Sequence, residues 1–212
     1  MRIFVIHYNK LIKRKLFILS QFKKYNITDY EFIEIERDDL YNHNISMFHK
    51  NYTNCQMSMS LKHFYAYKEI SDKYDNGLIL EDDAILINNF TDILNKYMEQ
   101  LPKNYDMLFI GDGCNLHIEK NKLIPNQNIY EKCLYPTRWG GNGASRCSDS
   151  YIISKICANK LCKYINNLNY KIELPIDWWI NVAARDNNFK VYWAEPTIVT
   201  QGTQNGLFQT SH

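Results

Sequence analysis

Residues 78–83 read Leu78-Ile79-Leu80-Glu81-Asp82-Asp83, an apolar run that ends in three consecutive acids. A short, continuous apolar run is typical of a buried parallel strand. The carboxyl ends of such strands open onto the ligand crevice of an α/β sheet. Three carboxylates at that place repel one another unless a cation lies among them. The stretch therefore predicts a buried strand with a charged site at its end.

An extended backbone places Glu81 and Asp83 on one side of the strand and Asp82 on the other. That spacing suits one divalent ion held by carboxylate oxygens. Mg²⁺ and Mn²⁺ prefer such ligands and keep positions open for substrate phosphates. We expect Glu81 and Asp83 to hold the ion. In the alternative interpretation, Asp82 and Asp83 only begin a loop and cap the next helix.

The segments around this strand alternate between strand and helix patterns, which is typical of an α/β fold. A β-rich run at residues 3–6 precedes an amphipathic helix at 11–23 with a basic outer face, and a strand follows at 30–35. A helix at 57–70 leads into the acidic strand. After it we expect a helix at 91–100 capped by Asn88 or Asn89, a strand at 105–110, a candidate edge strand at 129–134, a strand at 151–153, helices at 155–165 and 175–184, and a strand at 190–193. No repeat or linker interrupts this order, which predicts one domain over residues 1–212.

Length and composition exclude several classes of protein. A chain of 212 residues with 45% hydrophobic and 23% charged residues folds around a core without disulfide staples and is not disordered. A net charge of +2 gives no support for nucleic acid as a partner. No apolar run approaches the roughly 18 residues of a membrane helix, and the first residues carry no signal peptide. We therefore expect a cytoplasmic protein without a membrane span.

The six cysteines form no C-x-x-C pair and no cysteine–histidine block at zinc spacing. The sequence therefore predicts reduced and mostly buried thiols. They are Cys55, Cys114, Cys133, Cys147, Cys157 and Cys162.

Short motifs lie along nearly the whole chain in a fixed order. They are Ile3-Phe4-Val5-Ile6, Ser60-Leu61-Lys62-His63, Leu78-Ile79-Leu80-Glu81-Asp82-Asp83-Ala84, Leu108-Phe109-Ile110-Gly111, Ser150-Tyr151-Ile152-Ile153-Ser154, Ala158-Asn159-Lys160-Leu161, Pro175-Ile176-Asp177 and Pro196-Thr197-Ile198-Val199-Thr200-Gln201. In order and spacing they resemble glycosyltransferase family 25, which includes lipooligosaccharide and procollagen hydroxylysine galactosyltransferases. The resemblance implies a GT-A fold, a Rossmann-like, mostly parallel sheet flanked by helices. It also implies metal-dependent, inverting transfer of galactose or glucose from a UDP-sugar to a hydroxyl of a glycan or of collagen-type hydroxylysine.

The resemblance implies roles for the acids and for one residue near the C-terminus. Glu81 and Asp83 stand where the family's acidic motif meets the metal, Mn²⁺ or Mg²⁺, and the diphosphate. Asp82 would contact the ribose or hold a neighbouring loop. Gln201 stands where a further metal ligand is expected, and His212 is the alternative.

Several residues are candidates for donor binding. His7-Tyr8-Asn9 stands where the family usually has Asn-Leu-Asp, and we retain His7 and Tyr8 as candidates. Lys13, with Arg14 and Lys15, could add positive charge near the diphosphate or form a solvated helix face.

A glycine-rich run and a histidine add further donor-site candidates. Trp139, Gly140, Gly141 and Asn142 could form the wall of the donor-sugar site, because glycines allow close approach and Asn142 can both donate and accept hydrogen bonds; a plain turn is the alternative. His63 is either a packed, hydrogen-bonded histidine or a donor contact.

The candidate general base is Asp177, which would take a proton from the acceptor hydroxyl. Its position after Pro175-Ile176 also suits a helix N-cap. Trp178 and Trp179 beside it could stack on a sugar, although one of the two is expected in the core.

Two other functions remain open at this point. One is a metal-dependent phosphodiester or sugar-phosphate hydrolase, which also uses acids at a strand end. The other is a non-catalytic relative that binds nucleotide sugars.

Overall fold

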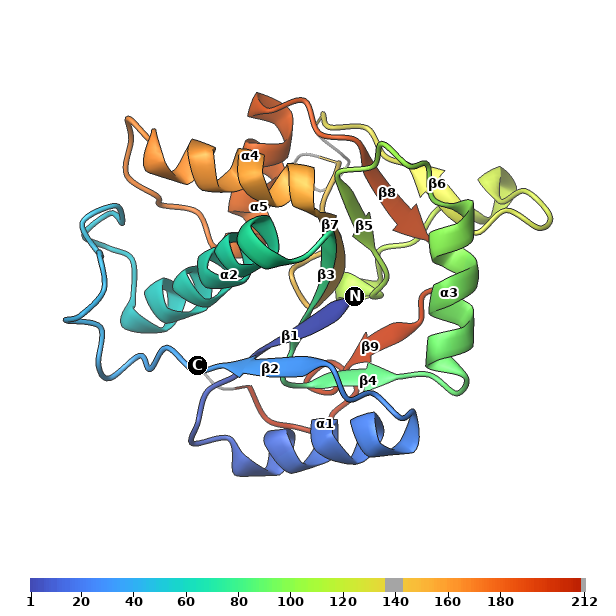
Figure 1. The fold of residues 1–212 in the computed structure, drawn as a ribbon, viewed down its shortest axis with the longest axis horizontal. Helices are drawn as coiled ribbons and strands as arrows, with labels where there is room; N and C mark the ends of the chain where they lie inside the picture. The colour runs from blue at the N-terminus through green and yellow to red at the C-terminus, as the bar shows by residue number, and fades with distance from the viewer. Residues whose placement is uncertain (136–142, 211–212) are drawn as a thin grey trace.

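The computed structural model describes residues 1–135 and 143–210. Its main sheet has seven strands in the order β2-β1-β3-β7-β5-β8-β6 (Figure 1). The strands are β1 (Arg2–Ile6), β2 (Tyr30–Ile33), β3 (Asn76–Glu81), β5 (Met107–Phe109), β6 (Ile129–Glu131), β7 (Ser150–Ser154) and β8 (Val191–Ala194). The helices are α1 (Ile12–Lys24), α2 (Asn54–Lys73), α3 (Phe90–Gln100), α4 (Lys155–Asn166) and α5 (Ile176–Asp186). Every helix and strand predicted from the sequence is present, with its bounds shifted by no more than three residues.

Strand pairing confirms the α/β class and a mostly parallel sheet. β1 pairs in parallel with β2 and β3, and β5 pairs in parallel with β8. β7 and β6 run against their neighbours, so five of the seven strands share one direction. β6 lies at the edge of the sheet, as its sequence predicted. Because β1 and β3 are parallel neighbours, their carboxyl ends, His7 and Glu81 to Asp83, lie at the same edge.

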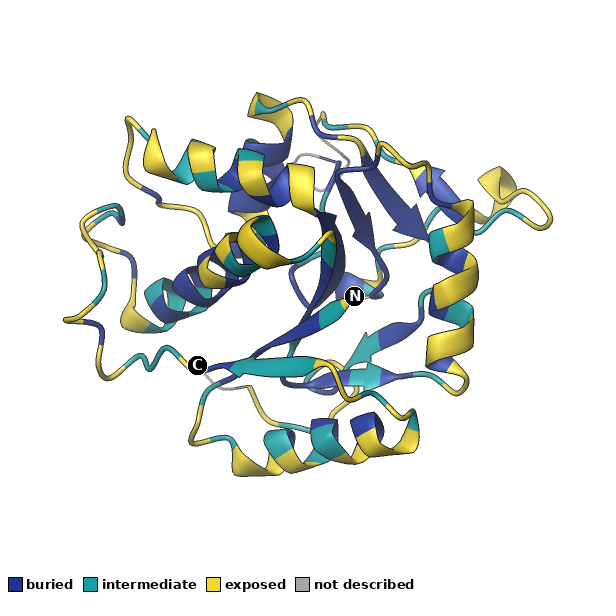
Figure 2. Ribbon diagram, viewed as in Figure 1, coloured by how far each residue is buried: buried dark blue, intermediate teal, exposed yellow. Residues whose placement is uncertain are grey.

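Two hydrophobic layers cover the sheet, because successive side chains of a strand point to opposite faces. Phe4 and Ile6 pack with helices α2, α4 and α5 on one face. Ile3 and Val5 pack with helices α1 and α3 on the other. Figure 2 shows the central strands dark blue and the outer sides of the helices yellow. The acidic strand β3 thus runs through the middle of the core.

A second, two-stranded sheet was not predicted from the sequence. It pairs β4 (Ala84–Leu86) with β9 (Val199–Gln201), in antiparallel register, and sets Gln201 opposite Ala84. Asp82 and Asp83 therefore lead into a strand, and the interpretation that they cap the next helix is wrong. Asn89 takes the N-cap position of α3 with a left-handed backbone (φ 58°) and makes no side-chain capping bond there. The pairing fixes the C-terminal segment beside the acidic motif.

Helix α2 begins at Asn54, earlier than the apolar pattern predicted. Thr53 and Gln56 form a reciprocal capping box that satisfies the first backbone N–H groups. The added turn brings Cys55 to the edge of the sheet where the acids lie.

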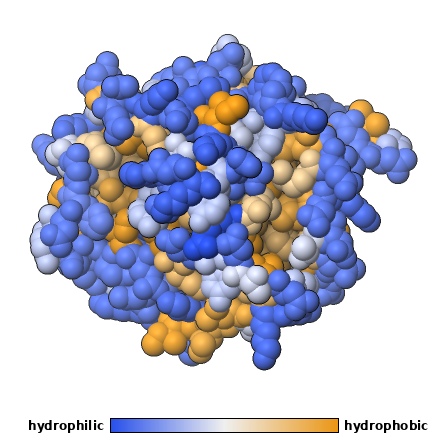
Figure 3. Space-filling model, viewed as in Figure 1, coloured by the Kyte–Doolittle hydropathy of each residue, from blue (hydrophilic) through white to orange (hydrophobic). Residues whose placement is uncertain are grey.

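Helix α1 does not have the purely basic outer face that was predicted. Ile12 and Leu16 are 64% and 61% exposed, and apolar atoms gather over this helix at the lower edge of Figure 3. Arg14 instead turns inward and is buried. Its position is set by an acid of the site described below.

Two expectations about the chain's chemistry have different outcomes. Within residues 1–135 and 143–210, no helix is both long and apolar enough to cross a bilayer.

All six cysteines are free, but Cys157 is the one that is buried, so the prediction of mostly buried thiols is wrong. The reason is position: Cys114, Cys133 and Cys147 lie in loops between strands rather than on inward helix faces.

Candidate active site

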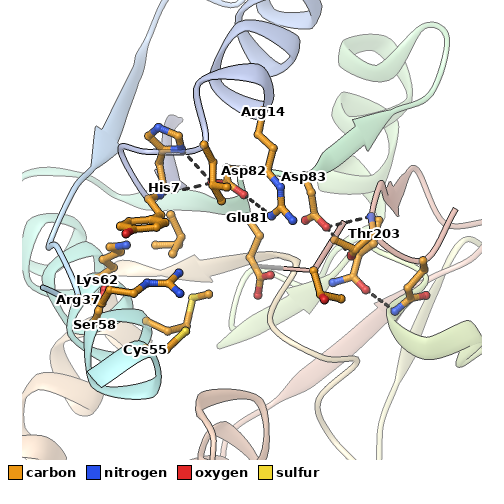
Figure 4. A pocket seen from close by; sticks show the side chains of 17 residues that line it. His7, Arg14, Arg37, Cys55, Ser58, Lys62, Glu81, Asp82, Asp83 and Thr203 are labelled. Carbon is orange, nitrogen blue, oxygen red and sulfur yellow. Dashed lines mark hydrogen bonds and ion pairs between the residues drawn. The ribbon is translucent and has the colours of Figure 1, made fainter. Parts of the chain in front are cut away.

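The end of β3 opens into a pocket lined from several parts of the chain (Figure 4). The end of β1 contributes His7 and Tyr8, and helix α1 contributes Arg14. The loop after β2 and helix α2 contribute Arg37 and Lys62. The acids at the end of β3 and the C-terminal segment complete the lining with Glu81, Asp82, Asp83, Gln201, Thr203, Gln204 and Thr210. Two of these segments lie about 200 residues apart in sequence, so the pocket depends on the complete fold.

Asp82 is the acid whose charge is compensated within the protein. Its carboxylate lies 2.8 Å from Nδ1 of His7 and accepts a hydrogen bond of 2.8 Å from Nη1 of Arg14. Burial alone would raise the pKa of Asp82, but the bonds to His7 and Arg14 outweigh it and lower the pKa. Asp82 therefore ties the end of β1 and the start of α1 to the end of β3.

Glu81 and Asp83 are in a different electrostatic environment. Glu81 accepts one bond of 2.7 Å from Oγ of Ser148. Burial first, and then the charge of Asp83, hold the pKa of Glu81 well above its usual range. Asp83 accepts bonds from the backbone N–H (3.2 Å) and the hydroxyl (2.6 Å) of Thr203 through Oδ2. Its buried Oδ1 has no partner among the described residues.

This arrangement fits a divalent cation. Half-buried Glu81 and buried Asp83 repel each other, and Oδ1 of Asp83 has no partner among the described residues, so added positive charge would relieve the repulsion. Gln201 lines the same pocket, and its amide oxygen accepts a bond from Gln204. The described residues contain no group of three His, Cys, Asp or Glu side chains arranged as a ready-made metal site. Further ligands would therefore come from Gln201 or from the substrate.

A cationic side of the pocket was not identified from the sequence. Lys62 is 3% exposed. Burial lowers the pKa of Lys62 to about 8, Glu36 and Asp82 act against that shift, and Arg37 adds to it. Figure 4 shows Lys62 and Arg37 on one side of Glu81 and Asp83 with Thr203 on the other. Lys62 gives no sequence signal, because the charged groups around it come from the loop after β2 and from the end of β3.

The predicted donor-binding residues are only partly brought together. His7, Tyr8 and Asp82 line the pocket. Lys13 does not: it lies on the exposed side of α1, and Arg14 enters the pocket in its place. The helical turn between the two residues separates them, because successive side chains diverge by about 100°. Trp139, Gly140, Gly141, Asn142 and His212 lie outside the described residues.

Asp177 lies in the first turn of α5 and is not part of the pocket lining. Pro175 takes the N-cap position, so the interpretation of Asp177 as N-cap is wrong. Burial raises the pKa of Asp177, against hydrogen bonds from the backbone of Trp178 and its own N–H. The hydroxyl of Ser145 donates to the Asp177 carbonyl at 3.0 Å, and three residues later Ser148 bonds to Glu81. One short segment thus connects the two acids.

Of the aromatic residues beside Asp177, Trp178 lies at the surface and Trp179 in the core, and His63 also lies in the core. Trp178 is 43% exposed and Trp179 is buried, as expected for one of the pair. His63 is fully buried, and its Nδ1 lies 2.7 Å from the hydroxyl of Tyr151. Burial, and then the charge of Lys62, lower the pKa of His63 to about 3. His63 is a packed, hydrogen-bonded histidine outside the pocket lining.

Comparisons with known proteins agree with the motifs. A family model described as glycosyltransferase family 25 (LPS biosynthesis protein) matches residues 1–180. The chain belongs to glycosyltransferase family 25. A curated relative is the procollagen lysyl hydroxylase and glycosyltransferase of Acanthamoeba polyphaga mimivirus, 25% identical over 167 residues. The match covers 71% of this chain and 17% of the relative, so the chain spans less than a fifth of that protein's length.

Solved structures of glycosyltransferases are also among the matches of this family 25 chain. A mutant of Drosophila β1,4-galactosyltransferase 7, in complex with manganese, UDP-Gal and xylobiose, is 13% identical with a TM-score of 0.45. That match covers 92% of this chain and 66% of the other. The glycosyltransferase GlyE of Streptococcus pneumoniae TIGR4 is 10% identical with a TM-score of 0.48, covering 92% of this chain and 44% of the other.

Proposed function

We propose that residues 1–212 act as one catalytic domain that transfers galactose or glucose from a UDP-sugar to an acceptor hydroxyl, with Mn²⁺ or Mg²⁺ and with inversion. The observation that carries this proposal is the arrangement of half-buried Glu81 and buried Asp83, whose charges repel each other, with the basic side formed by Lys62 and Arg37. Glu81 and Asp83 would hold the positive charge of a bound metal, and Lys62 and Arg37 would hold the negative charge of a diphosphate. We expect the cytoplasm as its compartment.

Glu81 and Asp83 would hold the metal, with the amide oxygen of Gln201 as a further ligand. The metal, when bound, supplies positive charge that stabilises the departing diphosphate. Ser148 and Thr203 fix the two carboxylates through the bonds described above. Each acid is thus oriented before the ligand enters.

Lys62 is proposed to bind the donor's phosphates. It is a buried ammonium on the pocket wall, and binding an anion would repay the desolvation that lowers its pKa. Asp82 would act as a positioning residue, because it fixes Arg14 and His7 at the donor end of the pocket. The uridine or ribose would then lie against His7 and Tyr8.

Asp177 is proposed as the general base. Its burial raises its pKa toward the range in which a carboxylate can accept a proton from a hydroxyl. The acceptor oxygen would attack the anomeric carbon, Asp177 would take its proton, and UDP would leave from the opposite face. The exposed ring of Trp178 offers a stacking surface for the acceptor beside this base.

The acceptor is a hydroxyl of a glycan or of hydroxylysine. The family description names LPS biosynthesis, and the mimivirus relative's name joins procollagen lysyl hydroxylase with glycosyltransferase. The two sources differ in chemistry: one presents a sugar hydroxyl and the other a hydroxyl on a cationic side chain.

The test is release of UDP from UDP-galactose and UDP-glucose with Mn²⁺, with a lactoside, a hydroxylysine peptide or no acceptor. We expect release to rise at least several-fold with one acceptor and to stop with a chelator. NMR of the product's anomeric proton reports inversion. Acceptor-independent cleavage of phosphodiesters would instead favour a hydrolase. UDP–metal binding without turnover would favour a non-catalytic relative.

A further inference from the structure

Two cysteines meet beside the proposed active site without being part of the pocket lining. The Sγ atoms of Cys114 and Cys147 lie 3.5 Å apart, although the residues are 33 positions apart in sequence. Cys114 follows β5 and is exposed, whereas Cys147 precedes β7 and is half-buried. Both have left-handed backbone conformations, with φ of 53° and 60°. Such conformations are uncommon for residues other than glycine, so the surrounding structure must hold both in place.

The backbone beside each cysteine is tightly fixed. A Cβ placed on Gly113 would lie 2.2 Å from the carbonyl oxygen of Arg146, so the two segments are packed backbone to backbone. The guanidinium of Arg146 is fully buried, donates to the carbonyls of Leu116 (2.6 Å) and Ala194 (2.8 Å), and pairs with Glu195. These contacts hold the cysteine segments together in the reduced protein. Neither segment has to unfold for the sulfurs to join.

We propose that Cys114 and Cys147 are a site of reversible disulfide formation. A disulfide requires the sulfurs to approach from 3.5 Å to about 2.05 Å. Such a shift of about 1.5 Å is within reach of side-chain rotation when the backbones are already adjacent.

The chemistry balances with hydrogen peroxide as oxidant. The exposed Cys114 thiolate attacks one peroxide oxygen, the O–O bond breaks, and Cys114 becomes a sulfenic acid while the other oxygen leaves as water. The sulfur of Cys147 then displaces the sulfenic hydroxyl, which takes the Cys147 proton and leaves as a second water. In sum, two thiols and one peroxide give one disulfide and two water molecules.

The order of the two steps follows from the environments of the thiols. Burial, and then Cys114 and Asp149, raise the pKa of Cys147, which disfavours its thiolate. Cys147 therefore serves as the resolving thiol, and Cys114, which is open to solvent, reacts first.

The disulfide would reach the acidic site through two contacts. Ser148, next to Cys147, holds Glu81, and Sγ of Cys114 lies 3.7 Å from Nε2 of Gln204, which bonds to Gln201. Drawing the sulfurs together would loosen these contacts. This consequence, unlike the disulfide itself, rests on the proposed function.

Peptide mapping tests the disulfide. The folded, full-length protein is treated with hydrogen peroxide, its remaining thiols are alkylated, and it is digested without reduction. We expect a linked peptide pair containing Cys114 and Cys147, lost on treatment with dithiothreitol and absent from Cys114→Ser. Cys133→Ser is the matched control, because Cys133 is also exposed, and it should form the link as the wild type does. If both thiols remain as open to alkylation as Cys133, or are oxidised without being joined, the proposal is overturned.

Binding of UDP with Mn²⁺ tests the coupling separately. Oxidation should weaken UDP binding about threefold to tenfold, as expected from the loss of one ordinary hydrogen bond, and reduction should restore it. Cys147→Ser should show no such response. A linked peptide pair with unchanged binding would overturn the coupling alone. Absence of UDP binding in the reduced protein would contradict the proposed function and leave the mapping result standing.

Discussion

The acidic and basic sides of the pocket carry opposite charges. On both sides, burial disfavours the charged form of a residue: Glu81 on the acidic side and Lys62 on the basic side. On the acidic side, half-buried Glu81 and buried Asp83 repel each other, and Oδ1 of Asp83 has no partner among the described residues. On the basic side, Lys62 is buried with its charge destabilised. Asp82 lies between Glu81 and Asp83 in sequence, yet His7 and Arg14 compensate its charge. The difference separates Asp82, which bonds to other parts of the fold, from Glu81, Asp83 and Lys62, which we propose bind the ligand.

The acidic side can be tested by replacing one carboxylate with the amide of the same shape. Asp83→Asn and Glu81→Gln should each reduce kcat/KM about 1,000-fold, because the metal's charge on the leaving diphosphate is lost. Both variants should melt at or above the wild-type temperature, since they remove a repelling buried charge. Initial rates and thermal melts measure the two effects. The control is Asp72→Asn, whose carboxylate lies in an exposed pair with Lys68. Wild-type turnover in Asp83→Asn would contradict the metal assignment.

The role of Asp177 at the acceptor end can be tested separately from the roles of the acidic and basic sides. Asp177→Asn should lower kcat about 100-fold, because proton removal from the acceptor is lost, with the Kd for UDP unchanged. Initial-rate kinetics and UDP titration measure the two quantities. Glu173→Gln, an exposed acid just before α5, should behave as the wild type. A parallel loss of UDP binding in Asp177→Asn would place this residue in donor binding instead.

The role of Lys62 on the basic side can be tested by the pH dependence of UDP binding. Lys62→Met should weaken UDP binding about tenfold at pH 7, whereas Lys68→Met on the exposed face of α2 should not. Because the pKa of Lys62 lies near 8, its charge is present below pH 8 and lost above it. Wild-type affinity should therefore fall between pH 7 and 9.5.

The charge-preserving variant provides the control for that profile. Lys62→Arg keeps its charge over this range, so its affinity relative to the wild type should rise with pH. The comparison removes the contributions of Glu36, Asp82, Arg37 and Cys55, which face Lys62 in both proteins. A ratio that does not change with pH would show that Lys62 does not bind the phosphates.

The last prediction concerns the stability of the fold outside the pocket rather than binding or turnover. The buried His63 is neutral when folded, with a pKa of about 3, and becomes charged more readily when unfolded, near 6.5. Its contribution to stability is thus present above pH 6.5 and lost as the pH falls, by about 2–3 kcal/mol at pH 4.5. In His63→Gln the melting temperature should decline less steeply from pH 6.5 to 4.5. Equal slopes in the two proteins would contradict a buried neutral His63.

The sequence predicted the features that depend on local pattern. Period-2 and period-3.6 apolar spacing identified the strands and helices of the main sheet, and three acids after an apolar run identified the strand end. β4 and β9 were missed because each is a short strand whose partner is the other, far away in the sequence. Their pairing is what sets Gln201 beside the acidic motif.

Features set by contacts between distant residues could not be predicted. Asp82 is bonded to His7 and Arg14, 75 and 68 residues away, and no spacing rule relates them. The choice of Arg14 over Lys13 depends on which side of α1 faces β3. The approach of Cys114 to Cys147 depends on the packing of two loops.

The central claim is that Glu81 and Asp83 bind nucleotide diphosphate through a divalent ion. Calorimetric titration of UDP into the protein, with Mn²⁺ and with a chelator, tests it most directly. The account predicts one UDP bound per chain with Mn²⁺, binding at least tenfold weaker with the chelator, and no difference between the two conditions in Asp83→Asn. Equal UDP affinity with and without Mn²⁺ in the wild type would contradict it.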